Sequence, residues 1–245
     1  MAKGEHGKPS KTDESEKILH STALKIPEIL KEVMLLSKRP EHAMSARECR
    51  TWSAIAIDVL WRDLNSVFPL LELIAPLEQG PENRLVFPNF IKPVEWERFH
   101  SYVRRVRSFA YNDTETHLTR NGYTGIISKT IFGDVYLINP TSGPLLPNAS
   151  EVTWTANEAT TAHLLLPFIS SHTEGLSIEL GPKCSAEAIN NLLNHLRCRV
   201  SGVLDFKIFI HNQVDDVTES LATCLGQMKA LQRVTLPMRF GASPR

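Results

Sequence analysis

The sequence lacks an excess of charge of either sign. Its 27 Lys and Arg residues equal its 27 Asp and Glu residues, so the formal net charge is zero. Nucleic-acid-binding proteins and polybasic membrane anchors usually carry basic residues concentrated on one face or segment. The one basic cluster, Arg104, Arg105 and Arg107, is expected to border a strand. We therefore expect protein partners, with no nucleic acid and no membrane among them.

Long apolar runs are also missing. No segment reaches the roughly 18–20 apolar residues that a membrane-spanning helix requires. The N-terminal residues contain no apolar stretch of the kind found in a secretory signal. These features predict an intracellular protein, in the cytoplasm or the nucleus.

Signatures of chemistry are absent as well. The four cysteines are far apart and form no CxxC pair, which argues against a disulfide framework and a zinc site. The common nucleotide-binding, metalloprotease and serine-hydrolase motifs do not occur. The histidines at 163, 172, 195 and 211 show no ligand-like spacing. We expect a non-enzymatic chain with no catalytic residue, no metal and no cofactor.

Residues 1–17 are almost devoid of apolar side chains and are expected to form a disordered tail. Residues 18–66 are expected to form a helical module. Its apolar residues recur at helical spacing after Pro27, and Pro40 separates the two stretches. The first stretch contains Ile26, Ile29, Leu30, Val33 and Leu36, and the second contains Trp52, Ile55, Ala56, Val59 and Leu60. So short a module buries little by itself, and we expect it to pack against the rest of the chain or a partner.

A helix and a proline-rich connecting loop are expected over residues 67–94, and a repeating region over 95–240. The repeat approximates the spacing L-x-x-L-x-L at Val106–Tyr111, Ala149–Trp154, Thr173–Ile178 and Leu231–Leu236, with a further alternating strand at Leu204–Ile210. Helix-like runs are expected at Ile126–Ile138, Thr160–Ile169, Ala186–Leu196 and Val217–Met228. From Val152 onward the steps between strands, 24 to 30 residues, lie close to the leucine-rich-repeat period of 20–29. The other reading is an ordinary α/β layer fold with coincidental spacing.

The pattern therefore predicts an α/β (α+β) chain. A short helical module precedes an irregular, leucine-rich-repeat-like solenoid of parallel strands joined by helices, because parallel pairing needs crossover connections. Residues that alternate with the buried ones should line the outer face of the strands and bind partner proteins. These are Thr153, Ser177, Glu179, Asp205 and Lys207, with Ala110 and Thr235 beside them. The chain ends at Arg245, soon after the last expected strand, and we therefore expect a truncated or naturally shortened member of a repeat family.

Residues 26–64 resemble the F-box. The opening Ile26-Pro27-x-Ile29-Leu30, the Cys49-Arg50-x-Trp52 step and the Leu60-Trp61 pair carry the resemblance. The stretches DVLWRDLNSVFPLLELIAP, WERFHSYVRRVRSF and LLPNASEVTW, which follow, are similar to fungal F-box proteins with repeat-like C-terminal regions.

The resemblance implies a substrate-receptor adaptor of an SCF-type ubiquitin ligase, acting in ubiquitin-dependent degradation. The F-box would bind the Skp linker protein and through it a cullin scaffold, while the repeats recruit a protein substrate. The implied linker contacts are Ile26, Pro27, Ile29, Leu30, Val33, Cys49 and Trp52.

Polar residues occupy positions where the family has apolar ones, namely Ser37, His42, Arg47 and Glu48. A buried, unpaired polar group costs on the order of 1–3 kcal/mol. Such groups either weaken linker binding or lie at the rim of the contact. The alternative function is therefore a leucine-rich-repeat-like interaction scaffold whose degenerate F-box no longer binds the linker.

Overall fold

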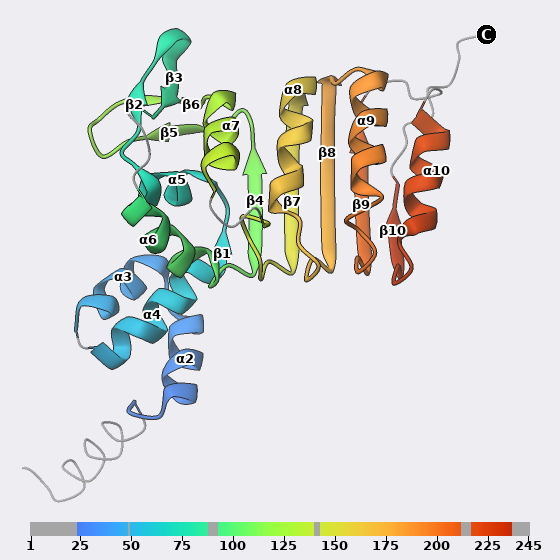
Figure 1. Cartoon of the computed structure of the whole chain (residues 1–245). Helices are drawn as coiled ribbons and strands as arrows, with labels where there is room; N and C mark the ends of the chain where they lie inside the picture. The colour runs from blue at the N-terminus through green and yellow to red at the C-terminus, as the bar shows by residue number, and fades with distance from the viewer. Residues whose placement is uncertain (1–23, 49, 88–92, 140–142, 212–216, 237–245) are drawn as a thin grey trace, which may run out of the picture. The chain divides into compact units, whose positions relative to one another are not determined.

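The computed structural model describes residues 24–48, 50–87, 93–139, 143–211 and 217–236 (Figure 1). The chain divides into two compact units, with the boundary between Arg62 and Asp63. The expected tail at 1–17 lies outside the described residues. The chain is a mixed α/β protein whose main sheet is parallel.

The first unit contains three helices, α2 (Pro27–Leu36), α3 (Arg39–Glu48) and α4 (Arg50–Arg62). Helix α2 begins at a proline, whose missing N–H needs no partner in a first helical turn. Its buried residues pack with residues of α4 in a small core. This core consists of Leu30, Met34, Ala56 and Val59, with Leu24, Ala46, Trp52 and Ile55 packed against it.

The second unit is built around a six-stranded sheet with the order β1-β4-β7-β8-β9-β10. Every neighbouring pair in it is parallel. Figure 1 shows the strands following one another in chain order. The strands are β1 (Asp63–Leu64), β4 (Ser108–Asn112), β7 (Glu151–Glu158), β8 (Gly175–Lys183), β9 (Asp205–Ile210) and β10 (Arg233–Thr235).

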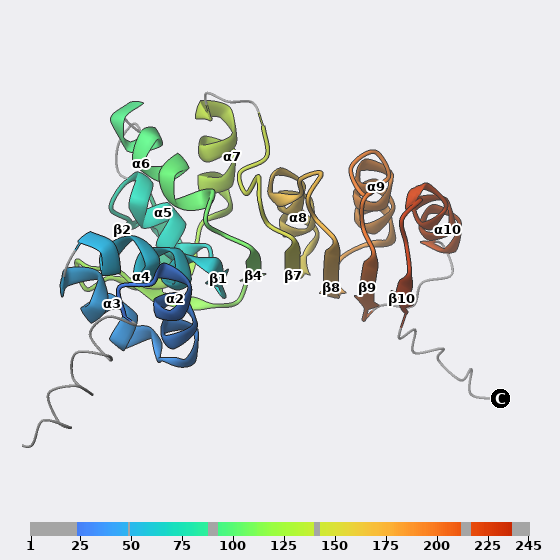
Figure 2. The ribbon, with the colours of Figure 1, turned by 90° about the horizontal axis from the view of Figure 1, so that it is seen from below.

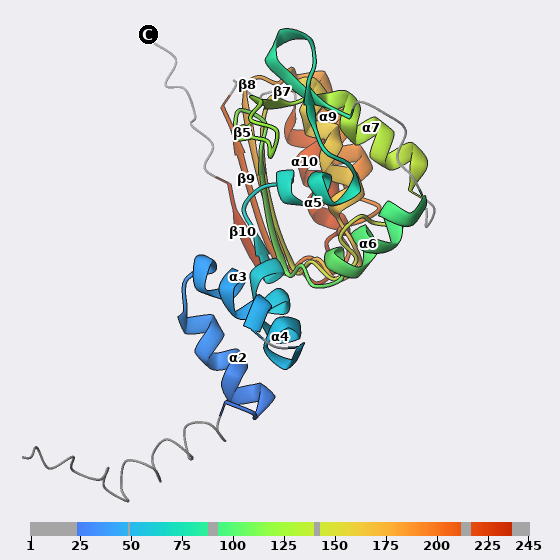
Figure 3. The ribbon, with the colours of Figure 1, turned by 90° about the vertical axis from the view of Figure 1, so that its left-hand side faces the viewer.

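A helical segment lies between each pair of successive strands. The segments are α5 (Phe68–Ile74) and α6 (Pro93–Val103), then α7 (Lys129–Ile138), then α8 (Ala159–Ala162) with the 3-10 helix η2 (His163–Phe168), then α9 (Ala186–Leu196) and α10 (Thr218–Gln227). Helix α9 shows why they form: Ser185 caps its N-terminus by accepting the Ala188 N–H, and its apolar stripe is buried. Figures 2 and 3 show α7 to α10 on one side of the sheet.

The register aligns the buried strand residues in rows that face these helices. One row runs through Phe109, Val152, Leu176 and Phe206, each at most 2% exposed. A second row contains Tyr111, Trp154, Ile178 and Ile208. Aromatic rings from the strands and helices meet at Trp154, which contacts Tyr111, Phe132 and Phe168.

The turns before the strands repeat one hydrogen-bond pattern. A single carbonyl oxygen accepts two backbone N–H groups from the start of the next strand, at 2.7–3.0 Å. These bonds join Arg107 to Ser150 and Glu151, Ser150 to Glu174 and Gly175, Glu174 to Leu204 and Asp205, and Leu204 to Gln232 and Arg233. The same corner therefore recurs four times along the sheet.

Two expectations were wrong in detail. Residues 67–94 are more than a helix and a loop, because β2 (Glu78–Gln79), η1 (Pro81–Asn83) and β3 (Arg84–Val86) lie there. These strands pair with β6 (Thr124–Ile127) and β5 (Thr116–Leu118) in a second sheet of order β2-β3-β6-β5. The helix expected at 126–138 accordingly begins at Lys129. The second sheet also explains the long step of 43 residues between Phe109 and Val152, since β5 and β6 lie within it.

Candidate functional site

Helix α2 of the first unit carries an exposed apolar strip, formed by Ile26 at its N-cap and by Ile29 and Val33. These residues are 44%, 41% and 44% exposed. They lie three and four residues apart, on one face of the helix. Leu36 continues the strip at 89% exposure. The apolar strip is therefore available to a partner, while the unit's own core is closed beside it.

The other predicted linker contacts differ in how exposed their side chains are. Pro27 is exposed at the start of α2. Leu30 is 1% exposed and belongs to the core, so its prediction as a surface contact was wrong. Trp52 is half-buried against the same core rather than open. Cys49 lies outside the described residues.

Two of the four unexpected polar residues are bound within the unit. The Ser37 hydroxyl donates to the Val33 carbonyl at 2.9 Å. The His42 side chain is buried, and its Nε2 hydrogen-bonds the Met34 carbonyl at the end of α2. Arg47 is exposed, and the side chain of Glu48 lies outside the described residues. Ser37 and His42 thus bind the Val33 and Met34 carbonyls in the last turn of α2.

The second candidate surface is the sheet face opposite the helices. The register places Thr153, Ser177 and Lys207 side by side in one row. Asp205 lies in the row before it, and Glu179 in the row after. All five residues predicted for substrate binding are exposed or half-buried.

A shallow groove of about 310 Å³ runs across this face. Thr153, Ser177, Asp205 and Lys207 line it, whereas Glu179 does not. The other lining residues, notably Glu151, Glu174 and Gly175, were not predicted from the sequence. Gly175 stands between Glu151 and Asp205 in their row, so the row has a gap where a side chain is absent.

Ion pairs fix the charged side chains around the groove. Asp205 Oδ2 lies 3.4 Å from Lys207 Nζ and 3.2 Å from Arg233. His211 Nε2 is 2.9 Å from Glu179 on the next row. Such partly exposed pairs contribute about 0–1 kcal/mol each. Their contribution to stability is therefore small.

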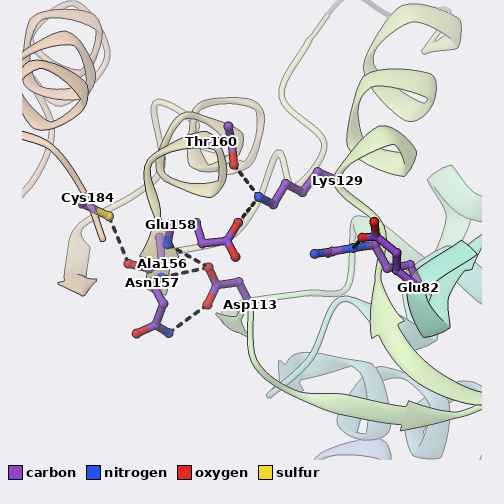
Figure 4. A network of polar contacts seen from close by, with 9 residues as sticks. Glu82, Asp113, Lys129, Ala156, Asn157, Glu158, Thr160 and Cys184 are labelled. Atoms are coloured by element: carbon purple, nitrogen blue, oxygen red, sulfur yellow. Dashed lines mark hydrogen bonds and ion pairs between the residues drawn. The ribbon is translucent and has the colours of Figure 1, made fainter. Parts of the chain in front are cut away.

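A third site, a polar pocket of about 120 Å³, lies at the carboxyl ends of β4, β7 and β8 and at the second sheet. In this polar pocket, Asp113 accepts the Asn157 backbone N–H at 2.8 Å, the Asn157 side-chain amide at 2.9 Å and the Glu158 N–H at 3.3 Å (Figure 4). Lys129 pairs with Glu158 and donates to the Thr160 hydroxyl. The Lys129 hydrogen bond lowers the pKa of Glu158.

Tyr111, which lines the polar pocket, and Cys184, which lies beside it, both keep their protons (Figure 4). Burial, followed by the charge of Asp113, raises the pKa of Tyr111 well above its ordinary value. Burial likewise raises the pKa of the Cys184 thiol, which donates to the Ala156 carbonyl at 3.4 Å. The Tyr111 hydroxyl therefore remains a hydrogen-bond donor at neutral pH. Sequence reasoning missed this pocket because its residues come from segments spread over about 100 positions.

Within the described parts of the chain, no helix is long and apolar enough to cross a membrane. No three His, Cys, Asp or Glu side chains come together there as metal ligands. No protein-family model matches the chain, and no match was found among curated proteins.

Proposed function

We propose that this chain is a non-enzymatic, F-box-type adaptor of an SCF-type ubiquitin ligase. Its first unit binds the Skp linker protein, which joins a cullin scaffold, and its second unit recruits a protein substrate. The observation that carries the proposal is the exposed strip of α2, at Ile26, Ile29 and Val33, beside a core that is already closed. An intracellular location, in the cytoplasm or nucleus, follows from the same proposal.

The energetics of the apolar strip support a partner. Full burial of an Ile or Val side chain contributes about 1.5–3 kcal/mol. With about two-fifths of Ile29 and Val33 exposed, each side chain retains about 0.6–1.2 kcal/mol for a partner. Apolar residues in an amphipathic helix at three- and four-residue spacing are the usual anchors of helix-in-groove recognition.

In the second unit we propose a leucine-rich-repeat-like solenoid. The recurring hydrogen-bond corner and the aligned buried rows support it, because stacked repeats place equivalent residues in register. A solenoid commonly binds its partner on the strand-lined face. That face carries the groove lined by Thr153, Ser177, Asp205 and Lys207, which we assign to the substrate.

One observation favours the alternative, a scaffold that has lost linker binding. The His42 side chain is buried and bound to the Met34 carbonyl, and Arg47 on the same helix is exposed and charged. If α3 contributes to the docking face, it offers no apolar replacement at these positions. The alternative keeps substrate assembly through the groove and removes the ligase.

The experiment compares linker binding by the full chain and two double variants. In the strip variant, Ile29→Ser and Val33→Ser, we expect about 8- to 60-fold weaker binding, because two anchors lose about 1.2–2.4 kcal/mol together. The control variant, Glu28→Ser and Lys31→Ser, places two serines on the face of α2 away from the strip and keeps the net charge. It should bind as the wild type does. Failure of the wild-type chain to bind the linker would favour the scaffold.

A further inference from the structure

The polar pocket at the ends of β4, β7 and β8 contains hydrogen-bond donors without matching acceptors. Thr161 is completely buried, and its hydroxyl oxygen has no hydrogen-bond partner among the described residues. Because burial without a partner costs about 1–3 kcal/mol, such a hydroxyl is unusual in a settled structure. Thr161 is also one of the residues that line the pocket.

The cationic side chains of the pocket differ in how strongly they are paired. Lys129 is engaged by Glu158 and Thr160. Arg84 lies 3.7 Å from Glu82, a carboxylate whose side chain is 82% exposed and which therefore holds it weakly. Lys183 lines the same pocket. Its charge and that of Arg84 both contribute to lowering the pKa of Glu158, after the larger effect of Lys129.

The carboxylates of the pocket, by contrast, are already satisfied. Asp113 accepts three N–H groups from Asn157 and Glu158. Glu158 itself is paired with Lys129. Figure 4 shows these contacts converging on the end of β7. The capacity that is left over belongs to donors: two cations, the Thr161 hydroxyl and the protonated Tyr111 hydroxyl.

We propose that this polar pocket binds a phosphate-sized oxyanion through Arg84, Lys183 and Thr161. Such an anion offers several acceptor oxygens to donors that a neutral ligand would leave partly unmatched. A pocket of about 120 Å³ is large enough to admit a phosphate. The carboxyl ends of parallel strands are also where open α/β sheets commonly bind ligands. The site is distinct from the apolar strip and the groove, and does not depend on the proposed ligase role.

The test is the thermal unfolding of the full chain in sodium phosphate, with sodium chloride at equal ionic strength as the reference. At ten times the dissociation constant, phosphate should raise the unfolding temperature by about 3 °C or more beyond chloride. Phosphate also stabilises proteins non-specifically, so variants are needed to separate specific binding from this general effect. Thr161→Val should unfold at the same or a higher temperature without phosphate, because it removes an unpaired buried hydroxyl.

With phosphate, Thr161→Val and Lys183→Met should each lose most of the specific shift, while Thr161→Ser should keep it. Lys229→Met removes an exposed lysine that does not line the pocket, and it should respond as the wild type does. A wild-type shift no larger than that of chloride overturns the proposal. Retention of the full shift in either Thr161→Val or Lys183→Met overturns it as well.

Discussion

Truncation of two residues of α2, three positions apart, should destabilise the first unit to very different extents. Leu30 is 1% exposed in the core of the first unit, and Leu30→Ala should destabilise that unit by about 2–5 kcal/mol. Val33 is 44% exposed. Val33→Ala removes two methyl groups worth about 0.8 kcal/mol each when fully buried, so about half of that is lost here. The higher helix propensity of Ala returns about 0.5 kcal/mol. The net cost should stay below about 0.5 kcal/mol.

Amide hydrogen exchange of α2 is the suitable assay, because the chain has two units and a single unfolding curve would mix them. The α2 amides of Leu30→Ala should exchange at least about 30 times faster than those of the wild type, since each 1.4 kcal/mol is a factor of ten. Exchange from Val33→Ala should change by about twofold or less. If Val33→Ala accelerates exchange as much as Leu30→Ala does, Val33 is a core residue and the apolar strip does not exist as described.

Three further predictions concern the second unit. Gly175→Ala should keep or slightly raise stability, because its Cβ would make only ordinary contacts. Gly181→Ala should destabilise the unit by moving β8, since that Cβ would lie 2.9 Å from a Cα of β7. Denaturation curves in which Gly175→Ala is the less stable of the two variants would contradict this. Burial raises the pKa of Cys224 to about 11, so alkylation at pH 8 mapped by mass spectrometry should label exposed Cys198 first; equal labelling of both would be evidence against the packing of α10. Burial and a neighbouring histidine lower the pKa of His163, so the unfolded chain binds more protons than the folded chain just below pH 6.5. The free energy of unfolding should therefore decrease as the pH is lowered through that window. His163→Gln should flatten this part of the stability profile, and an unchanged slope would disprove the assignment.

The parallel sheet was predictable because period-two alternation and recurring spacing are strong signals. The rows through Phe109, Val152 and Leu176 fall where the sequence pattern placed them. The second sheet was not predictable, since strands such as Glu78–Gln79 and Thr116–Leu118 are two or three residues long and depend on their pairing for stability.

The division of α2 into core and surface was also beyond the sequence. Leu30 and Ile29 are adjacent, and helical periodicity places them on neighbouring arcs of one broad apolar face. Only the packing of α4 decides which arc is covered. The polar pocket is a stronger case, because Arg84, Lys129 and Lys183 have no sequence relationship and come together only when two sheets form.

The central claim is that the apolar strip on α2 is the docking surface for the linker. Hydrogen exchange of the full chain with and without saturating Skp linker protein measures this directly. We predict slower exchange in residues 27–36 and no change in strands β8 and β9. Unchanged exchange across α2, or protection confined to the second unit, would contradict the account.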